Sequence, residues 1–198
     1  MIKTVLFDLG NVFISVEPDH FWEKLGLRTL AQRSPYDTKV RSASQLFERG
    51  EISANEFFVL QEGMFEKKFT LPQLHAAFDS ILITPIEGME LLVTNVQTRA
   101  RTALVSNTNA VHWEACLKNI RVLSKLQAHY LSYEIKAMKP DPNFYAYVIK
   151  KEKFAPEEML FVDDVEENVK GAEKAGMRAH QFTTVARLSD ALKQYGVI

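Results

Sequence analysis

Short, largely apolar runs that end at a polar residue recur along the chain, and they predict the central strands of a parallel sheet. Such strands are covered on both faces, so they appear as continuous apolar runs rather than as alternating patterns. Three runs are of this kind: residues 2–7 before Asp8, residues 102–105 before Ser106, and residues 159–162 before Asp163. We therefore predict three buried strands, each with a polar side chain at its carboxyl end.

The stretch between the first two runs has a helical pattern instead. From about residue 18 to residue 82, apolar side chains recur at helical spacing, as Phe21, Trp22 and Leu25 do. Ser53 to Glu56 has the form of a capping box, which typically opens a helix. We find no strand pattern here, and the stretch is far longer than an ordinary connection. We therefore predict a helical insertion in an α/β core, with residues 15–83 as the insertion and residues 1–14 and 84–198 as the core.

Beyond Pro85, predicted strands and helices alternate. Helices are predicted over about residues 86–98, around 113–117 and 144–148, up to Gly176 and from Ser189, with short strands at 129–131 and 178–182. Strands that are separated by helices imply a parallel sheet with right-handed crossovers. The predicted fold class is α/β: a Rossmann-like parallel sheet with helices on both faces and a small helical insertion after the first strand.

The composition changes this picture little, but it excludes some classes of function. Of the 198 residues, 46% are hydrophobic and 25% are charged, and the net charge is −1, which is ordinary for a globular protein. No basic excess suggests nucleic acid, and no apolar stretch reaches the ~18 residues of a membrane span. Cys116 is the only cysteine, so no internal disulfide can form. We expect a cytoplasmic protein that binds neither nucleic acid nor membranes, and its oligomeric state stays open.

Polar side chains at the strand ends supply the candidate chemistry. The carboxyl ends of parallel strands share one edge of the sheet, so residues from three strands and one loop should gather there: Asp8, Ser106, Asn107, Lys139, Asp163 and Asp164. A single aspartate after a strand is best interpreted as a turn or capping residue. The combined set favours a functional site instead.

The residue types in this set suit phosphoryl transfer. One or two carboxylates, together with water and substrate phosphate, are the usual ligands of Mg²⁺. A lysine neutralises charge on a nucleophile and on a phosphate, while hydroxyl, amide and backbone N–H groups hold phosphoryl oxygens. A carboxylate can then accept the phosphoryl group as an aspartyl-phosphate, which water hydrolyses.

Four short motifs carry a family resemblance. In chain order they are Phe7 to Val12, Val105 to Thr108, Lys139-Pro140, and Phe161 to Asp164 with Asn168 beyond. With these motifs, the whole chain resembles the haloacid dehalogenase-like (HAD) hydrolase superfamily. The insertion is similar to the small helical cap of that superfamily. Within it, the segment Phe47–Ser53 is similar to the subgroup that contains α-glucose-1-phosphate phosphatases.

The resemblance implies roles for individual residues. Asp8 would be the nucleophile, and Lys139 would assist catalysis by orienting the phosphate. Mg²⁺ would be bound by Asp8, by the backbone carbonyl of Gly10, and by Asp163 or Asp164, of which Asp164 is preferred. The remaining positions would bind the substrate, a small phosphorylated metabolite such as a sugar phosphate: Gly10, Asn11, Ser106, Asn107, Thr108 and Lys139.

Gly10 departs from the family pattern. Phosphatases of the superfamily have a second aspartate at this position, which protonates the leaving group and later activates water. Without it, either the leaving group must be good, as in a sugar 1-phosphate, or another residue must supply the proton. Five side chains of the insertion are candidates: Glu17, Asp19, His20, Glu48 and Glu51. Glycine could also serve a backbone conformation that aspartate cannot adopt.

Two other functions compete with that of a phosphatase. A dehalogenase-type hydrolase would use Asp8 to displace halide without a metal, and such enzymes also lack the second aspartate. The other alternative is a phosphate-binding protein with impaired turnover, and Gly10 is its only support. The pair Asp163 and Asp164 indicates a metal, and hence favours a Mg²⁺-dependent phosphatase.

Overall fold

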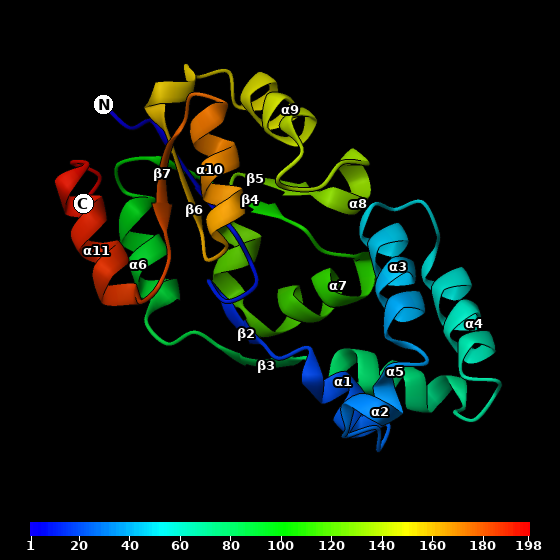
Figure 1. The fold of residues 1–198 in the computed structure, drawn as a ribbon. Helices are drawn as coiled ribbons and strands as arrows, with labels where there is room; N and C mark the ends of the chain where they lie inside the picture. The colour runs from blue at the N-terminus through cyan, green and yellow to red at the C-terminus, as the bar shows by residue number, and fades with distance from the viewer.

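A parallel sheet of five strands forms the centre of the protein. The computed structural model describes all 198 residues, and the strands follow the order β5-β4-β1-β6-β7 (Figure 1). Their bounds are Thr4–Phe7 (β1), Arg101–Ser106 (β4), Ala128–Leu131 (β5), Met159–Asp163 (β6) and Arg178–Gln181 (β7). All neighbouring pairs are parallel. The three strands that were predicted as buried are the three central ones.

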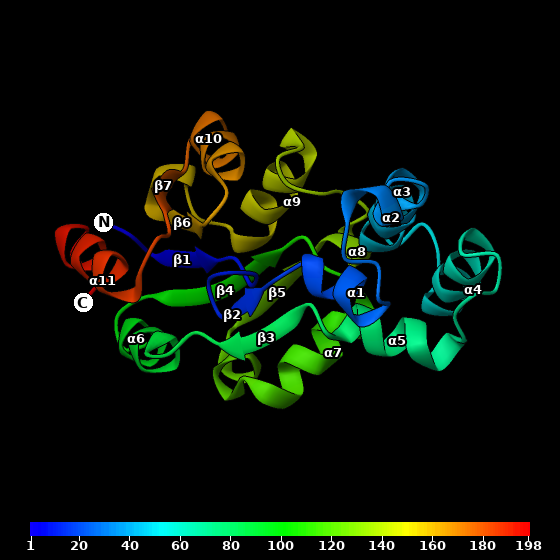
Figure 2. The ribbon, with the colours of Figure 1, turned by 60° about the horizontal axis from the view of Figure 1, so that its bottom comes forward.

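Alternating side chains of the central strands face two separate apolar cores. In β1, Val5 and Phe7 pack on one side of the sheet, and Leu6 packs on the other. Helices cover both sides (Figure 2): α6 (Met89–Val96), α7 (Ala110–Asn119) and α11 (Val185–Gln194) on the side of Phe7, and α9 (Pro142–Glu152) and α10 (Glu166–Lys174) on the side of Leu6. The predicted α/β fold with helices on both faces is confirmed.

Residues 19–79 form a helical segment with an apolar core of its own. Its helices are α1 (Asp19–Lys24), α2 (Leu30–Arg33), α3 (Asp37–Glu48), α4 (Ala54–Met64) and α5 (Leu71–Asp79). Phe47 of α3 lies 4.7 Å from Phe57 of α4, and Phe57 lies 4.9 Å from Phe78 of α5, between ring centroids. The predicted capping box forms, because Ser53 Oγ accepts from the Glu56 N–H and the Glu56 carboxylate accepts from the Ser53 N–H. These three aromatic side chains therefore serve packing.

A small antiparallel sheet connects the helical segment to the core. In it, β2 (Ile14–Val16) pairs with β3 (Leu82–Pro85), so the chain leaves and re-enters the core side by side. The prediction of a helical pattern without strands up to residue 82 was wrong at this end. Both strands are very short, and their partners are far apart in the sequence, so no local periodicity marks them.

Two helices begin at residues other than the predicted ones, because the residue before each helix sets its start. Helix α6 begins at Met89 rather than at residue 86, because Gly88 precedes it with a φ of 85°. Helix α11 begins at Val185, before the predicted start, because the Thr184 side chain caps it. Four elements of about one turn escaped prediction: α2, α8 (Ser132–Ile135) and the 3₁₀ helices Arg121–Lys125 and Pro156–Glu158. None of the helices combines the length and the apolar character that crossing a membrane requires.

The helical segment contacts the core through backbone carbonyls at the end of α3. Ser132 Oγ donates to the Glu48 carbonyl at 2.6 Å, and Lys136 Nζ donates to the Gly50 carbonyl. Gly50 has a φ of 61°, and a Cβ at this position would collide with the Tyr133 carbonyl, so only glycine fits. The end of α3 is thereby held next to α8, which follows the carboxyl end of β5.

Candidate active site

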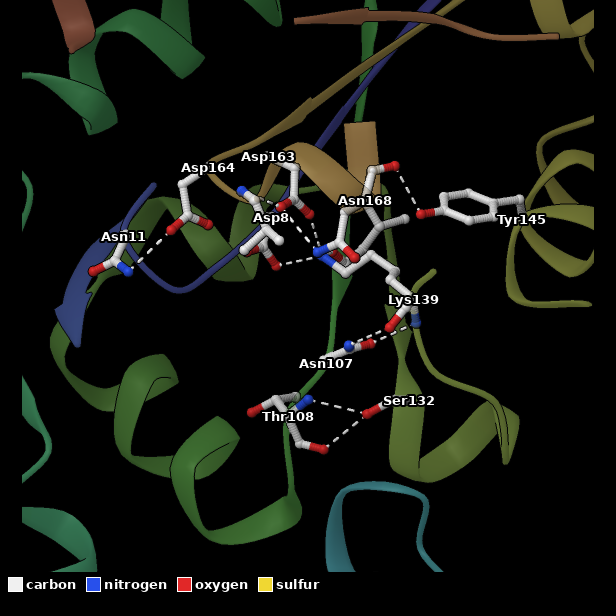
Figure 3. A network of polar contacts seen from close by, with 12 residues as sticks. Asp8, Asn11, Asn107, Thr108, Ser132, Lys139, Tyr145, Asp163, Asp164 and Asn168 are labelled. Atoms are coloured by element: carbon white, nitrogen blue, oxygen red, sulfur yellow. Dashed lines mark hydrogen bonds and ion pairs between the residues drawn. The ribbon is translucent and has the colours of Figure 1, made fainter. Parts of the chain in front are cut away.

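The carboxyl ends of β4, β1 and β6 bring together the polar residues that the sequence singled out. Asp8 directly follows β1, while Ser106 and Asp163 are the last residues of β4 and β6. The register of β1 with β6 sets Asp8 directly beside Asp163, and its register with β4 puts Ser106 one residue further along the same edge of the sheet. All three are buried, and Figure 3 shows the polar network that surrounds Asp8 and Asp163.

Lys139 is buried at the centre of this network and uses all three of its ammonium hydrogens (Figure 3). Its Nζ donates to Asp8 Oδ1 at 2.7 Å, to Asp163 Oδ2 at 2.6 Å and to the Val105 carbonyl at 2.9 Å. The Asn107 side chain accepts from the Lys139 N–H at 2.8 Å and donates to the Lys139 carbonyl at 2.9 Å. The lysine is therefore fixed at its backbone and at its charged end.

Burial and the neighbouring charges together shift the pKa values of Asp8 and Lys139. Burial raises the pKa of Asp8 to about 7; the Lys139 ammonium opposes this shift, and the Asp163 carboxylate adds to it. Burial alone would lower the pKa of Lys139, but the carboxylates of Asp8 and Asp163 outweigh it and hold that pKa above its usual value. Lys139 is therefore a permanent cation, whereas the charge of Asp8 depends on what else enters the site.

The two adjacent aspartates at the end of β6 have different surroundings. Both oxygens of Asp163 are occupied: Oδ2 accepts from Lys139, while Oδ1 accepts from a backbone N–H two residues further on at 2.9 Å and from Asn168 Nδ2 at 3.0 Å. Asp164 is half-buried, and its Oδ2 accepts from Asn11 Nδ2 at 3.0 Å. Asp163 thus holds Lys139 and the turn in place, whereas Asp164 retains an oxygen with which it can bind a cation.

The three carboxylates fit a divalent cation. One oxygen each from Asp8, Asp163 and Asp164 lie within 4.8 Å of one another. When ionised, they carry three negative charges against the one positive charge of Lys139, so the excess charge favours a dication. Carboxylate and carbonyl oxygens with room for water are the ligands that Mg²⁺ takes, and Gly10 lies on the wall of the same cavity.

The turn after β1 depends on Asn11 rather than on Gly10. Asn11 has a φ of 52°, a left-handed conformation that asparagine tolerates better than most residues. Its side chain joins Asp164 to the chain at Val16, whose N–H donates to Asn11 Oδ1 at 3.0 Å. The φ of Gly10 lies outside the left-handed region, and a Cβ there would meet only the Val16 side chain, at 3.4 Å. The backbone therefore does not require glycine at position 10.

Ser132 and Thr108 form a second group of hydrogen bonds near Asn107 and Lys139 (Figure 3). Ser132 is fully buried and accepts from the Thr108 N–H at 3.0 Å, and its hydroxyl donates toward the carbonyls of Glu48 at 2.6 Å and of Thr108 at 3.0 Å. Ser132 thereby ties the loop after β4 to the end of α3. Our sequence interpretation missed it, although it directly follows β5 and could have been found by the rule that identified the other strand ends.

Replacing Ser132 with alanine is expected to lower the free energy of unfolding by about 1–3 kcal/mol, because a buried N–H loses its acceptor and a buried carbonyl loses its donor. Urea unfolding of the variant measures this loss. Ser124→Ala is the matched control, since Ser124 is exposed and its hydroxyl bonds only to the Arg121 carbonyl. Equal losses in the two variants would contradict the role of Ser132.

Two adjoining cavities lie between the sheet edge and the helical segment. The first, of about 250 Å³, is lined by every predicted metal or substrate residue except Asp163, which is buried outside its wall. The second, of about 380 Å³, has walls from α1, α3, α4 and α5 that include Trp22, Arg41 and Gln61. Four residues belong to both walls: Val16, Glu48, Ile81 and His112. The polar cluster is thus continuous with a larger space beneath the helical segment.

Comparison with known proteins agrees with this geometry. A model of the haloacid dehalogenase-like hydrolase family matches residues 2–176. The chain belongs to this family. It is also 26% identical, over 195 residues, to the D-ribitol-5-phosphate phosphatase of Bacteroides thetaiotaomicron, and the match covers 91% of this chain and 92% of the relative. The resemblance to HAD hydrolases that the four motifs indicated is confirmed.

Solved structures support the same assignment. A HAD family enzyme of Bacteroides thetaiotaomicron is 28% identical with a TM-score of 0.85, and the match covers 96% of this chain and 98% of that one. The same enzyme in complex with magnesium and inorganic phosphate is 27% identical with a TM-score of 0.78, over 93% of this chain and 96% of that one. The chain therefore shares the fold of a HAD enzyme that binds both magnesium and phosphate.

Proposed function

We propose that this HAD hydrolase is a Mg²⁺-dependent phosphatase that hydrolyses a small phosphorylated metabolite through an aspartyl-phosphate on Asp8. The observation that carries this proposal is the set of three carboxylates within 4.8 Å of one another around a buried lysine, on an open cavity. A relative named as a phosphatase and a similar enzyme with bound magnesium and phosphate support it.

Asp8 attacks the phosphorus atom. Lys139 holds Oδ1, which fixes the direction of the carboxylate and leaves Oδ2 for the attack. A bond forms between Oδ2 and phosphorus while the bond from phosphorus to the leaving-group oxygen breaks, and an aspartyl-phosphate results. Water then attacks the same phosphorus, the bond to Asp8 breaks, and inorganic phosphate leaves with the carboxylate restored.

Residues of the loop after β4 hold the phosphoryl oxygens. Ser106, Asn107 and Thr108 line the cavity next to Lys139, so the two hydroxyl groups and the Asn107 backbone N–H can bind phosphoryl oxygens, whereas the Thr108 N–H is used by Ser132. The Asn107 carboxamide is already paired with the Lys139 backbone, so we assign it the positioning of that lysine. Gly10 and Asn11 line the same cavity and would complete the contacts to the phosphoryl group.

Asp8, the Gly10 carbonyl and Asp164 would hold Mg²⁺. A bound ion would neutralise charge on the phosphoryl oxygens and on Asp8 as the transition state forms. Asp163 uses both oxygens for hydrogen bonds within the chain, so we assign it the orientation of Lys139 rather than direct metal binding. The bond between Asn11 and Asp164 would fix the ligand oxygen.

The rest of the substrate would occupy the second cavity. This space combines the aromatic side chain of Trp22 with polar side chains such as those of Arg41 and Gln61, which suits a polyhydroxylated group such as a sugar or a sugar alcohol. Residues 15–83 would then act as the cap of a catalytic core made of residues 1–14 and 84–198. A panel of sugar and sugar alcohol phosphates, assayed with Mg²⁺, tests the substrate class.

Hydrolysis of phosphate esters is expected to vanish after exhaustive chelation and to return when Mg²⁺ is added, because the carboxylate cluster lacks a counter-charge without the ion. Asp164→Asn should raise the Mg²⁺ concentration that gives half of the maximal rate, and calorimetry should show weaker Mg²⁺ binding. Glu167→Gln is the control, since Glu167 is exposed on α10 nearby. Full activity after chelation would overturn the metal site.

A metal-independent dehalogenase remains the alternative. Gly10 is compatible with it, but that chemistry gives no reason for Asp164 beside Asp8 and Asp163. Release of halide from a 2-haloacid in the presence of chelator, without hydrolysis of phosphate esters, would establish this alternative. Tight binding of inorganic phosphate without hydrolysis of any ester in the panel would indicate a binding protein instead.

A further inference from the structure

The missing acid at position 10 leaves a gap in the proposed reaction. A primary alkyl ester needs a proton on its leaving oxygen, and the attacking water must lose one. Of the five candidate side chains of residues 15–83, four lie outside the walls of the catalytic cavity: Glu17, Asp19, His20 and Glu51. Asp19 is also paired with Arg33 at 2.7 Å, and Glu51 lies 3.9 Å from Arg49.

Glu48 is the candidate that lines the catalytic cavity. It is the last residue of α3, and it belongs to the walls of both cavities, where the leaving oxygen of a bound substrate would lie. Its backbone carbonyl is fixed by Ser132, which also binds the backbone of Thr108. One buried hydroxyl therefore sets the position of Glu48 relative to the loop that holds the phosphoryl group.

The other titratable groups around the two cavities cannot supply the proton. His112 of α7 is buried: its Nε2 lies 3.0 Å from the Phe78 carbonyl, so that this nitrogen carries the hydrogen, and its Nδ1 then accepts from Asn109 Nδ2 at 3.2 Å. Burial lowers the pKa of His112, which keeps the ring neutral in this bonded state. Lys139 has no free hydrogen, and Asp8 and Asp164 are assigned to attack and to metal binding. Burial raises the pKa of the Cys116 thiol, which lines the same cavity, to about 11, so this group is not poised to exchange a proton near neutral pH.

Two further charged side chains of α3 line the second cavity. Arg41 donates to Asp37 at 3.2 Å, and a guanidinium does not release a proton near neutral pH. The Asp37 carboxylate is partly exposed and is paired with that cation. Among the charged groups on both walls, Glu48 is the one without a partner in the chain.

We propose that Glu48 is the general acid and base of this enzyme, in the role that Gly10 cannot fill. The proposal rests on the proposed phosphatase function. In the first step, the Glu48 carboxyl group gives its proton to the leaving oxygen as the bond from that oxygen to phosphorus breaks. In the second step, the Glu48 carboxylate takes a proton from the attacking water, which restores the starting state.

The electrostatics of the site suit an acid that is protonated near neutrality. Burial raises the pKa of Glu48 to about 7, so both of its charge states are populated in the physiological range. Its place as the last residue of α3 acts in the same direction, because the negative end of the helix dipole disfavours a carboxylate. The negative charge of a bound phosphate would add to this effect.

The test is a leaving-group series on the full-length protein with Mg²⁺. In Glu48→Gln, kcat/KM should fall by ~10²–10³-fold for a primary alkyl phosphate such as D-ribitol 5-phosphate, but change little for 4-nitrophenyl phosphate, whose leaving group needs no proton. For the aryl ester, kcat should fall and a burst of 4-nitrophenol should appear, because the aspartyl-phosphate accumulates. Glu51→Gln, an exposed carboxylate three residues away, should leave the whole series unchanged.

Two further measurements separate an acid from a structural residue. For the alkyl ester, wild-type kcat/KM should decline as pH rises above about 7, and this decline should be absent in Glu48→Gln. Adding Gly10→Asp to Glu48→Gln should raise the activity on the alkyl ester at least ~10-fold above that of Glu48→Gln, since a Cβ at position 10 meets only the Val16 side chain at 3.4 Å. If Glu48→Gln does not fold, Glu48→Asp keeps the acid and should keep the alkaline decline.

The outcomes distinguish this proposal from the proposed function. A wild-type protein without activity on any phosphate ester would overturn the phosphatase function. An active wild-type protein whose Glu48→Gln variant loses alkyl and aryl activity equally, or loses neither, would overturn the role of Glu48 alone. A Glu48→Asp variant without the alkaline decline would do the same.

Discussion

Asp8→Asn is expected to reduce phosphate-ester hydrolysis below detection while the fold persists. The substitution keeps the size of the side chain and an oxygen that can accept from Lys139, but it removes the charge that attacks phosphorus. Steady-state assays with an alkyl and an aryl phosphate measure the loss. Because the step that fails is bond formation to phosphorus, both substrates should lose activity together, in contrast to Glu48→Gln.

Stability provides an internal check on this variant. Burial raises the pKa of Asp8 to about 7 in the folded protein, so this group favours folding most below its ordinary pKa and loses that contribution as pH rises through about 7. At pH 8 the neutral asparagine avoids the cost of a buried charge, and Asp8→Asn should unfold at the same temperature as the wild type or a higher one. At pH 5 this advantage should shrink.

The control for Asp8→Asn is Asp190→Asn, which removes an exposed carboxylate on α11 far from the cavity and should leave activity intact. A fluoroberyllate-type phosphate mimic should appear bonded to Asp8 in a crystal of the wild-type protein and not in one of the variant. Substantial turnover in a pure preparation of Asp8→Asn would mean that another group is the nucleophile.

The sheet and its polar edge could be predicted from the sequence because their signals are local. A buried parallel strand is a continuous apolar run, and the residue after each run, such as Asp8 or Asp163, falls at the edge where ligands bind. Helices α3 and α4 are similarly local, because apolar spacing and a capping box define them. Motif order then indicated the HAD family without any knowledge of the packing.

The parts that escaped prediction depend on contacts between distant segments. The β2–β3 sheet forms from two strands whose partners are far apart in the sequence. The different surroundings of Asp163 and Asp164 follow from Lys139 and Asn11, which arrive from other loops. Glu48 could not be chosen from its rivals, because its place in the cavity requires the anchoring of α3 by Ser132.

Lys139→Met is expected to impair folding stability and catalysis together. Methionine fills a similar volume but leaves the Asp8 and Asp163 carboxylates buried without their cation, and breaking such a buried pair typically costs about 3–5 kcal/mol. Denaturant unfolding at pH 8 measures this loss. Lys150→Ala, an exposed lysine on α9, is the control and should change the free energy of unfolding by less than about 0.5 kcal/mol.

The pH dependence of that loss identifies its cause. Without Lys139, the pKa of Asp8 should rise further above that of the unfolded chain, so lowering the pH should protonate this carboxylate and stabilise the variant. The stability difference from the wild type should therefore shrink between pH 8 and pH 5. A difference that is independent of pH would point to lost packing instead of unpaired charge.

Catalysis by Lys139→Met should fall by at least ~10²-fold in kcat/KM even where the protein is fully folded, since a cation beside the nucleophile and the phosphoryl group stabilises both the bound substrate and the transition state. Both kcat and KM should therefore worsen, unlike in Glu48→Gln, where the alkyl leaving group decides the size of the effect. The measurement is a Michaelis series at saturating Mg²⁺ and at a pH where circular dichroism shows the variant folded. Unchanged constants would remove Lys139 from the reaction and leave it the purely structural task of neutralising Asp8 and Asp163.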